Sequence, residues 1–413
     1  MNQPAIEVVV ADDAIERLAE RLRDGALVVM DANTERAAGA RLVAALADAE
    51  PLLFEQRSGL VPTPEAVDRV RARCHGGRPT VAVGSGVITD IVRRAVDLAD
   101  AEFLSVPTAA SMDGYASSVA ALQLDDVKVT VPARPPRAIF ADPRVAAQAP
   151  LQLTRSGIGD LLAKAAARVD WLASHLLYGE PFSAEVDRRV VAIVSWVAAN
   201  VDRVLAGHVE AVAQLLGGLI DSGLAIAAVG SSRPASGCEH HASHFWDLLA
   251  ARGCRPHHPH GMQVGYATWF AMRLQRFAFG GGVARLRRPS PPSDPLASAA
   301  RRWLGDPPPA IVAAVQEKQR FAARLDQWPA DDIGWESVRA AIRPTLEPFG
   351  SVECALERAG IPDAPGFLDV DERMLRATFR YASRLRARYT VIDFLEGQRA
   401  LDEGLTAMLR PPG

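Results

Sequence analysis

ALVVMDANTERAAGARLVAALADA, residues 26–49, opens with a short apolar run and continues with apolar residues at helical spacing. The same alternation recurs along the next sixty residues. PLLFEQ (51–56), TVAVGSG (80–86) and EFLSVPT (102–108) have the composition of short strands, and residues 63–76 and 87–100 have that of helices. Strands separated by helices of this length are typical of parallel βαβ units. The chain therefore predicts an open, doubly wound α/β sheet of Rossmann-like type, in which ligands bind at the carboxyl ends of strands.

The pattern changes after about residue 148. From residue 153 onward nearly every segment has the pattern of an amphipathic helix, and strand-like runs are absent. We expect two domains: a nucleotide-binding α/β domain over residues 1–148, and an all-helical bundle with the metal and substrate sites over residues 149–413. The proline-dense segment 285–309 cannot form a continuous helix, so it is predicted to be a surface loop within the bundle.

Composition limits the class of protein. Of the 413 residues 49% are apolar, enough for a large core, and a net charge of −3 without a long basic run argues against a nucleic-acid partner. Four cysteines at unrelated spacings indicate free thiols in a reducing compartment. The N-terminus lacks a basic start before an apolar core, and no segment approaches the length of a transmembrane helix. We therefore expect a cytoplasmic protein without a membrane partner, and a homo-oligomer, by default a dimer.

Six of the nine histidines fall within residues 240–260. His240 and His244 stand four apart, which on a helix places both imidazoles on one face. His260 follows in a loop of proline, glycine and histidine, and Asp160 lies upstream in a turn flanked by glycine. Two histidines and one carboxylate around an open position are a common ligand set for a catalytic zinc ion. The chain supplies such a set.

Other interpretations of this region stay open. Clustered histidines are often solvated or line a pocket, and His241 and His257 are expected at a pocket rim or on the surface. A rival metal site would use Cys238 and Cys254 with a histidine as a structural zinc centre. Neither cysteine belongs to a C-x-x-C pair, which disfavours that site.

Three segments of the first domain are candidates for binding a phosphate or a cofactor. Gly84-Ser85-Gly86 closes a strand and opens a helix, where backbone amides and the helix dipole are available to a pyrophosphate, although Thr89 takes the last position of G-x-G-x-x-G. Thr108–Ser111 are small residues that let a ligand approach the backbone. Asp31 ends the first strand, where it could bind a ribose diol or equally cap a helix.

Six motifs together resemble one family in order and spacing. They are SVPTAASMDGYASSVAAL (105–122), PARPPRAIFADP (132–143), SGIGDLLAK (156–164), SSRPASGCEHHASHFWDLL (231–249), HGMQVGYATW (260–269) and RARYTVIDF (386–394). The chain resembles the sn-glycerol-1-phosphate dehydrogenases over about residues 26–394. These enzymes belong to the superfamily of dehydroquinate synthases, glycerol dehydrogenases and iron-dependent alcohol dehydrogenases. The resemblance implies the dehydroquinate synthase-like fold.

The resemblance also implies roles for individual residues. Asp160, His240 and His260 match three metal ligands, and His244 matches a residue that contacts the substrate, so these four form the expected catalytic set. Asp113 matches a substrate-binding carboxylate, and Asp160 is expected to touch the substrate as well. With the segments described above, the expected cofactor-binding residues are Asp31, Gly84, Ser85, Gly86, Val87, Ile88, Thr89, Asp90, Thr108, Ala109, Ala110, Ser111 and Ser117.

Three positions depart from the family pattern. Thr89 stands where asparagine is usual, Cys238 where serine is common, and Val129 where lysine is frequent. Val129 leaves the affinity for phosphate open. The cation available nearby is Lys128, which would have to turn inward to bind a substrate phosphate and otherwise is a solvated strand residue.

The activity implied by the resemblance is metal-dependent, NAD(P)H-linked reduction of dihydroxyacetone phosphate to sn-glycerol 1-phosphate, and the reverse, in a cleft between the domains. This would be a step of phospholipid metabolism. The expected cofactors are NAD(H) or NADP(H) and Zn²⁺, with Ni²⁺ or Fe²⁺ as alternatives. A dehydrogenase of another small phosphorylated or free polyol remains an alternative. Less favoured are a dehydroquinate-synthase-like cyclase and an inactive cofactor-binding module.

Overall fold

The structure of the chain is a computed structural model that describes residues 6–56, 59–74, 77–124, 127–289, 309–324, 328–329 and 331–410. The chain divides into two compact units. Unit 1 comprises Met1–Leu161 and Asn200–Gly230, and unit 2 comprises Leu162–Ala199 and Ser231–Gly413. Unit 1 contains the β-sheet, whereas every regular element described in unit 2 is a helix.

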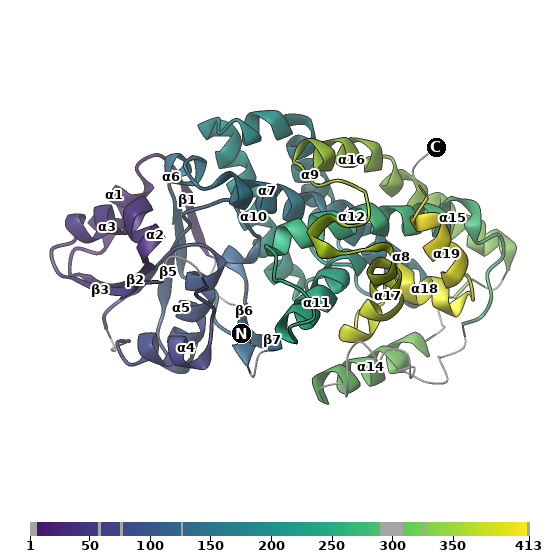
Figure 1. Cartoon of the computed structure of the whole chain (residues 1–413), viewed down its shortest axis with the longest axis horizontal. Coiled ribbons are helices and arrows are strands. Elements are labelled where there is room, and N and C mark those ends of the chain that lie inside the picture. Colours follow the sequence, from purple (N-terminus) through teal and green to yellow (C-terminus); the bar gives the residue numbers. More distant parts are fainter. Residues whose placement is uncertain are drawn as a thin grey trace. The chain divides into compact units, whose positions relative to one another are not determined.

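Unit 1 is built on a six-stranded sheet with the strand order β1-β8-β5-β4-β2-β3 (Figure 1). All its pairings are parallel, which confirms the predicted α/β class. The four predicted strands are present, and β1 and β8 are two further strands that the sequence pattern did not single out. The strands are β1 (Glu7–Val10), β2 (Ala26–Asp31), β3 (Ala49–Phe54), β4 (Thr80–Val83), β5 (Phe103–Val106) and β8 (Ala138–Ala141).

The direction in which strands are added to the sheet reverses between β2 and β4. β2 pairs with β3 on one side and with β4 on the other, and β5 then continues away from β3. In open α/β sheets, ligands bind outside the carboxyl ends of the strands at such a switch point. A cofactor is therefore expected to bind at the carboxyl ends of β2 and β4.

Helices cover both faces of the sheet, because the strands are apolar on both sides. From β2, Val28 and Met30 pack in one apolar core with α1 (Ala14–Arg21) and α3 (Ala40–Ala45). Leu27 and Val29 pack in another with α4 (Pro64–Arg71) and α5 (Gly86–Leu98). Figure 1 shows the two helix pairs on opposite sides of the sheet. Such doubly buried strands are typical of parallel sheets.

Unit 1 also contains short elements and two longer helices. They are α2 (Ala32–Thr34), the π-helix η1 (Glu35–Gly39), the 3-10 turn η2 (Gly114–Ala116), the antiparallel hairpin β6 (Val119–Leu124) and β7 (Val127–Pro132), α6 (Pro143–Ala147), α7 (Leu151–Leu162) and α10 (Val209–Val229). α10 is long and apolar enough to cross a membrane by length and composition, so the expectation that no segment approaches that length is wrong. It packs against α6 and η2, and 50% of its most apolar stretch is buried. The apolar residues of α10 that are buried are therefore covered by other elements of unit 1.

Unit 2 is a bundle of helices around α12, which packs against α8, α11, α16, α18 and α19. Its elements are α8 (Lys164–Tyr178), α9 (Ala184–Leu205), α11 (Cys238–Ala251), α12 (His260–Phe277), η3 (Ala278–Gly282), α14 (Pro309–Ala322), α15 (Asp332–Leu346), α16 (Phe349–Arg358), η4 (Phe367–Asp369), α17 (Glu372–Tyr381), η5 (Ala382–Leu385), α18 (Val391–Gly397) and α19 (Leu401–Met408). α9 kinks at Asn200, where the chain enters unit 1. The predicted all-helical region after the sheet is confirmed.

Two expectations about chain organisation are not decided. Most of the predicted surface loop, residues 290–308, lies outside the described residues. The domain boundary at residue 148 follows the change in secondary-structure class and stays a prediction.

Candidate active site

The three predicted cofactor segments come together at one edge of the sheet. β2 pairs directly with β4, and extending their register places Asp31 level with Gly84. The register of β4 with β5 likewise places Thr108 level with Ser85. Ser85 Oγ and Ser111 Oγ are hydrogen-bonded at 2.5 Å. All three segments therefore lie at the switch point, where an open α/β sheet binds its ligand.

The two glycines after β4 are there for different reasons. A Cβ on Gly84 would lie 2.7 Å from the Cβ of Ile88, so the packing of α5 on the turn requires glycine. A Cβ on Gly86 would meet only Met112 atoms, at 3.7 and 3.8 Å, which are ordinary contacts. Packing therefore leaves room for a side chain at Gly86. The predicted approach of a phosphate to the backbone at the start of α5 would be a reason for glycine there, and it stays a prediction.

Asp31 is the N-cap of α2. Its Oδ1 accepts hydrogen bonds from the backbone N–H groups of Asn33 and Thr34 at 2.8 and 2.9 Å. Thr34 Oγ1 in return accepts one from the N–H of Asp31 at 2.9 Å, which completes a capping box. The capping role that the sequence left open is thus present. A contact of Asp31 with a ribose stays a prediction.

A buried arginine ties α5 to the chain after β5. The Arg93 guanidinium is 1% exposed and donates to the Asp90 carboxylate at 2.8 Å. It also donates to the carbonyl oxygens of Val119, Gly114 and Tyr115 at 3.0, 2.6 and 3.0 Å. Burial lowers the pKa of Arg93, and the charge of Asp90 opposes that shift. Asp90 therefore has a structural partner, and its predicted contact with the cofactor is untested.

Two helices pack closely on the loop that follows β5. A Cβ on Gly157 of α7 would lie 2.0 Å from the carbonyl oxygen of Ala110, and one on Gly223 of α10 would lie 2.8 Å from the carbonyl oxygen of Asp113. Both neighbours are backbone atoms, which cannot rotate away. Glycine at these positions therefore fixes the loop that contains the predicted cofactor-binding residues Thr108–Ser111.

Two predicted substrate-binding residues meet on this loop. The backbone N–H of Asp113 donates to Oδ2 of Asp160 at 3.0 Å, and Asp160 on α7 is fully buried. The carboxylate of Asp113 accepts a hydrogen bond from Ser222 Oγ of α10 at 3.0 Å. Asp113 and Asp160 are thus held in unit 1 by hydrogen bonds from neighbouring elements, which orient them before any ligand binds.

The other predicted residues of unit 1 lie in the same elements. Val87, Ile88 and Thr89 form the first turn of α5, where Ile88 and Thr89 are buried and Val87 is exposed. Ser117 Oγ accepts the backbone N–H two residues further on at 3.1 Å. Lys128 lies on β7, and its side chain is outside the described part of the structure. The phosphate role of Lys128 is therefore untested.

Three predicted histidines meet in unit 2, where α11 packs against α12. His240 and His244 are one turn apart on α11, and His260 is the first residue of α12. The ring centroids of His240 and His260 are 5.3 Å apart, and that of His244 is 6.4 and 6.0 Å from those of His240 and His260. The ligand nitrogens of His240 and His260 lie within 4.8 Å of one another. This spacing makes the two imidazoles candidate ligands of one metal ion.

Hydrogen bonds fix the orientation of these two imidazoles. His240 Nδ1 donates to Oε1 of Glu239 at 2.8 Å, and Glu239 is fully buried and also accepts the N–H of Gly237 at 2.7 Å. His260 Nδ1 lies 3.3 Å from Ser243 Oγ. With Nδ1 protonated, each imidazole presents Nε2 as the ligand nitrogen. This donor set, with a buried carboxylate behind one ligand, fits a divalent metal ion.

The neighbouring histidines differ in burial. The side chain of His257 is 66% exposed, as expected of a surface residue. His241 is fully buried, so its expected place at a rim or on the surface is wrong. α11 packs against α8, α12, α17 and η5, which buries nearly its whole circumference. Burial lowers the pKa of His241 well below the usual 6.5, with added repulsion from arginines and Lys318.

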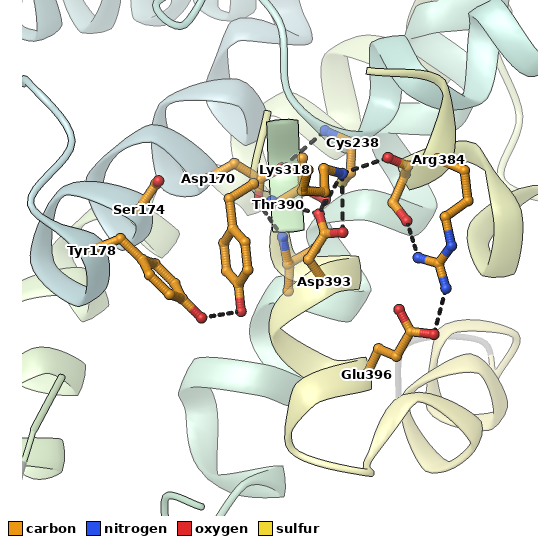
Figure 2. Close-up of polar contacts among 12 residues, drawn as sticks. Asp170, Ser174, Tyr178, Cys238, Lys318, Arg384, Thr390, Asp393 and Glu396 are labelled. Atoms are coloured by element: carbon orange, nitrogen blue, oxygen red, sulfur yellow. Dashed lines mark hydrogen bonds and ion pairs between the residues drawn. The ribbon is translucent and has the colours of Figure 1, made fainter. Parts of the chain in front are cut away.

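A buried carboxylate on α8 holds the beginning of α11. Asp170 accepts a hydrogen bond from the N–H group of Cys238 at 2.9 Å (Figure 2). It also accepts hydrogen bonds from the N–H group of Val391 at 3.0 Å and from Gln275 Nε2 at 2.9 Å. Burial and the charge of Glu239 raise the pKa of Asp170 to about 6. Asp170, Cys238 and Glu239 have potential ligand atoms within 4.8 Å of one another. Their hydrogen bonds to the backbone assign them a structural role at the start of α11.

The alternative zinc centre on two cysteines has no support in the part of the chain that the structure describes. Cys238 is buried and Cys254 is exposed. No group of potential metal ligands found among the described residues includes Cys254.

Comparisons with known proteins place the chain in a family. The sequence profile described as iron-containing alcohol dehydrogenase matches residues 7–150. A glycerol-1-phosphate dehydrogenase (NAD(P)+) of Halalkalibacterium halodurans is 34% identical over 282 residues, 65% of this chain and 70% of that protein. This chain belongs to the glycerol-1-phosphate dehydrogenase family. A relative of the same name from Bacillus licheniformis is 29% identical over 402 residues, 94% of this chain and 88% of its own.

Solved structures agree on the fold. The iron-containing alcohol dehydrogenase of Thermococcus thioreducens superposes with a TM-score of 0.62 at 15% identity, covering 100% of both chains. The resemblance inferred from the motifs is therefore confirmed, and the chain is an oxidoreductase of the glycerol-1-phosphate dehydrogenase type.

The structure adds residues to this glycerol-1-phosphate dehydrogenase site that the sequence pattern did not single out. Glu239 immediately precedes His240 in the chain. Helical spacing predicts contacts between residues three or four positions apart, so it does not predict a contact between neighbouring residues. Arg93 looks like an ordinary surface residue of an amphipathic helix until its four acceptors are seen. In the sequence, the one sign of a role for Glu239 is that this acidic residue immediately precedes His240, a candidate metal ligand.

Proposed function

We propose that this chain reduces dihydroxyacetone phosphate to sn-glycerol 1-phosphate with NADH or NADPH, and catalyses the reverse, with a divalent metal bound by Asp160, His240 and His260. The observation that carries the proposal is the pair of histidines on α11 and α12, one of them oriented by the buried Glu239 carboxylate. A histidine whose Nδ1–H donates to a buried carboxylate is typical of a metal ligand and not of a solvated surface residue. The names of the relatives supply the substrate and the cofactor.

The dinucleotide is proposed to bind at the edge of the sheet formed by the ends of β2, β4 and β5. The start of α5 offers backbone N–H groups and the positive end of a helix dipole to the diphosphate, with Gly86 leaving room for it. Thr108–Ser111 would lie along the nicotinamide, in a loop whose place Gly157 fixes. Asp31 would face the ribose.

Catalysis divides between groups that bring their own chemistry and side chains that position them. When bound, a divalent metal supplies Lewis-acid polarisation of a carbonyl, and a reduced nicotinamide supplies hydride. Asp160, His240 and His260 would hold the metal ion, and Glu239 orients the His240 imidazole. Asp113, held by Ser222, would orient the hydroxyl groups of the substrate. Correct positioning of two reactants accounts for a large part of the rate enhancement in such a reaction.

His244 is proposed to supply a proton to the alcohol oxygen that forms. It stands one turn from His240, and its ring is stacked on that of His260 at an interplanar angle of 17°. A positioned imidazole contributes typically 10²–10⁴ in rate as an acid or base. A water molecule is the alternative proton source.

Further properties belong to the same proposal. Zinc suits two imidazoles and a carboxylate, and Ni²⁺ or Fe²⁺ can occupy the same donors. We propose a cytoplasmic homodimer that acts in phospholipid metabolism. A dehydrogenase of a free polyol is the second candidate, because Val129 stands where the family often has lysine.

The experiment compares two substrates that differ only in phosphate. Initial rates of NADH and NADPH oxidation are measured with dihydroxyacetone phosphate and with dihydroxyacetone, after reconstitution with Zn²⁺. A site built around a phosphate leaves its own polar groups unpaired when that group is missing, so kcat/KM should differ by at least ~10³. A ratio near one would contradict the assignment and favour a free-polyol dehydrogenase.

A further inference from the structure

Two segments of unit 2 that lie far apart in the sequence are joined next to α11. The loop 231–237 runs directly into α11, and residues 386–390 run into α18. Arg233 donates to the carbonyl oxygen of Tyr389 at 2.6 Å. In the opposite direction, Arg388 donates to Ser232 Oγ at 2.5 Å and to the carbonyl oxygen of Ser236 at 3.3 Å. The contact to Ser236 is made four residues before His240.

The charges of this cluster are unequally compensated. Arg233 is paired with the Glu180 carboxylate, at 2.6 Å from Nε to Oε1. Both acceptors of Arg388 are neutral. Arg386 has no hydrogen-bond or ion-pair partner within the described part of the chain, although its surroundings are desolvated enough to lower its pKa. Arg386 and Arg388, called the arginine pair below, are both half-buried.

The arginine pair carries an electrostatic cost. Burial lowers the pKa of Arg388 to about 9, repulsion by Arg233 and Arg386 adds to the effect, and the charges of Glu239 and Glu180 oppose it only in part. Removing guanidinium groups from water beside one another is unfavourable unless an anion compensates them. Guanidinium groups bind phosphate oxygens in forked pairs of charge-assisted hydrogen bonds, and they are the preferred side chains for this task.

We propose that Arg386 and Arg388 bind the phosphate group of a phosphorylated small-molecule substrate. This inference rests on the proposed function, which requires a dianionic phosphate to be held near the histidines of α11. Arg388 lies against the loop that leads into that helix, and Arg386 stands two residues before it in the chain. Neither guanidinium forms an ion pair with a carboxylate among the described residues. In this proposal the cations that bind the substrate phosphate belong to unit 2. The sequence pattern had indicated only Lys128 for this role.

The clean test is Arg386→Gln, because this side chain makes no hydrogen bond within the described structure that the substitution would break. Loss of one charged hydrogen-bonding group should lower kcat/KM for dihydroxyacetone phosphate roughly 10- to 100-fold. The value for dihydroxyacetone should be unchanged, since that molecule has no phosphate. Arg386→Lys should restore part of the loss. Arg376→Gln, an exposed arginine of α17 paired with Glu372, is the matched control and should change neither value.

A binding measurement separates this inference from the proposed function. Inorganic phosphate that binds the folded protein raises its melting temperature. The shift should be present in the wild type and in Arg376→Gln, and reduced in Arg386→Gln. Equal shifts in all three proteins, or no shift in the wild type, would overturn the phosphate site. If the wild type turns over neither substrate, the proposed function fails, while the thermal shifts still decide the role of the arginine pair.

Discussion

Gly157→Ala should destabilise unit 1 and slow turnover together. The added Cβ would lie 2.0 Å from the carbonyl oxygen of Ala110, about 1 Å closer than real Cβ atoms approach their neighbours. Overpacking usually costs about 1–3 kcal/mol, and a clash with backbone belongs at the upper end of that range. Alanine in a helix interior regains about 1 kcal/mol over glycine. The net loss should therefore be about 2 kcal/mol, which lowers the melting temperature by roughly 4–8 °C.

The same clash should reach the active site. Relieving it moves the loop of Ala110 by about 1 Å, and misplacement of this size can reduce a rate about 10²-fold. Gly217→Ala on α10 is the matched control, because its Cβ meets nothing within 4 Å. That variant should gain up to about 1 kcal/mol and keep its activity. Urea unfolding and initial rates test the pair. If Gly157→Ala is as stable and as active as Gly217→Ala, the close contact between α7 and the loop is refuted.

Three further outcomes follow from unit 2. His244→Ala should retain its metal but lose about 10²–10⁴ in rate, whereas the exposed His257→Ala should lose far less; equal losses would refute the role of His244. Glu239→Gln should weaken zinc binding about 10- to 100-fold in competition with a chelator, and unchanged affinity would refute its orienting role. Burial lowers the pKa of Lys318 from 10.5 to about 8, so between these pH values the unfolded chain binds a proton that the native chain has released. The free energy of unfolding, measured with urea, should therefore rise from about pH 8 to 10.5. Lys318→Met should lack this rise, and the same pH slope in both proteins would refute the buried lysine as its cause.

The sequence predicts the sheet well where strands are buried on both faces. β2, β4 and β5 appear as continuous apolar runs followed by glycine, proline or an N-cap residue, and those followers mark the edge where ligands bind. The sequence pattern does not set α10 apart, because this segment has the pattern of one more helix of the bundle. Its place beside the loop after β5 follows from packing, which no local pattern encodes.

Helical spacing correctly places His240 and His244 one turn apart on α11. It does not place the other two candidate ligands: His260, expected in a loop, starts α12, and Asp160, expected in a turn, lies within α7. The roles of these residues stay predictions. The burial of His241 is not predictable from local spacing, because it depends on four other elements that pack around α11. Arg388 joins Ser232 through a contact between residues distant in the chain, so only the tertiary structure reveals it.

Metal content and turnover, measured on the same samples, test the central claim most directly. Wild type, His260→Ala and His257→Ala are reconstituted with Zn²⁺, dialysed and analysed for bound metal, and their rates with dihydroxyacetone phosphate and NADH or NADPH are recorded. Removal of one of three protein ligands leaves too few donors to hold zinc in an open site. His260→Ala should lose both bound metal and activity, whereas His257→Ala should keep both. Stoichiometric zinc and a near-normal rate in His260→Ala would contradict the account.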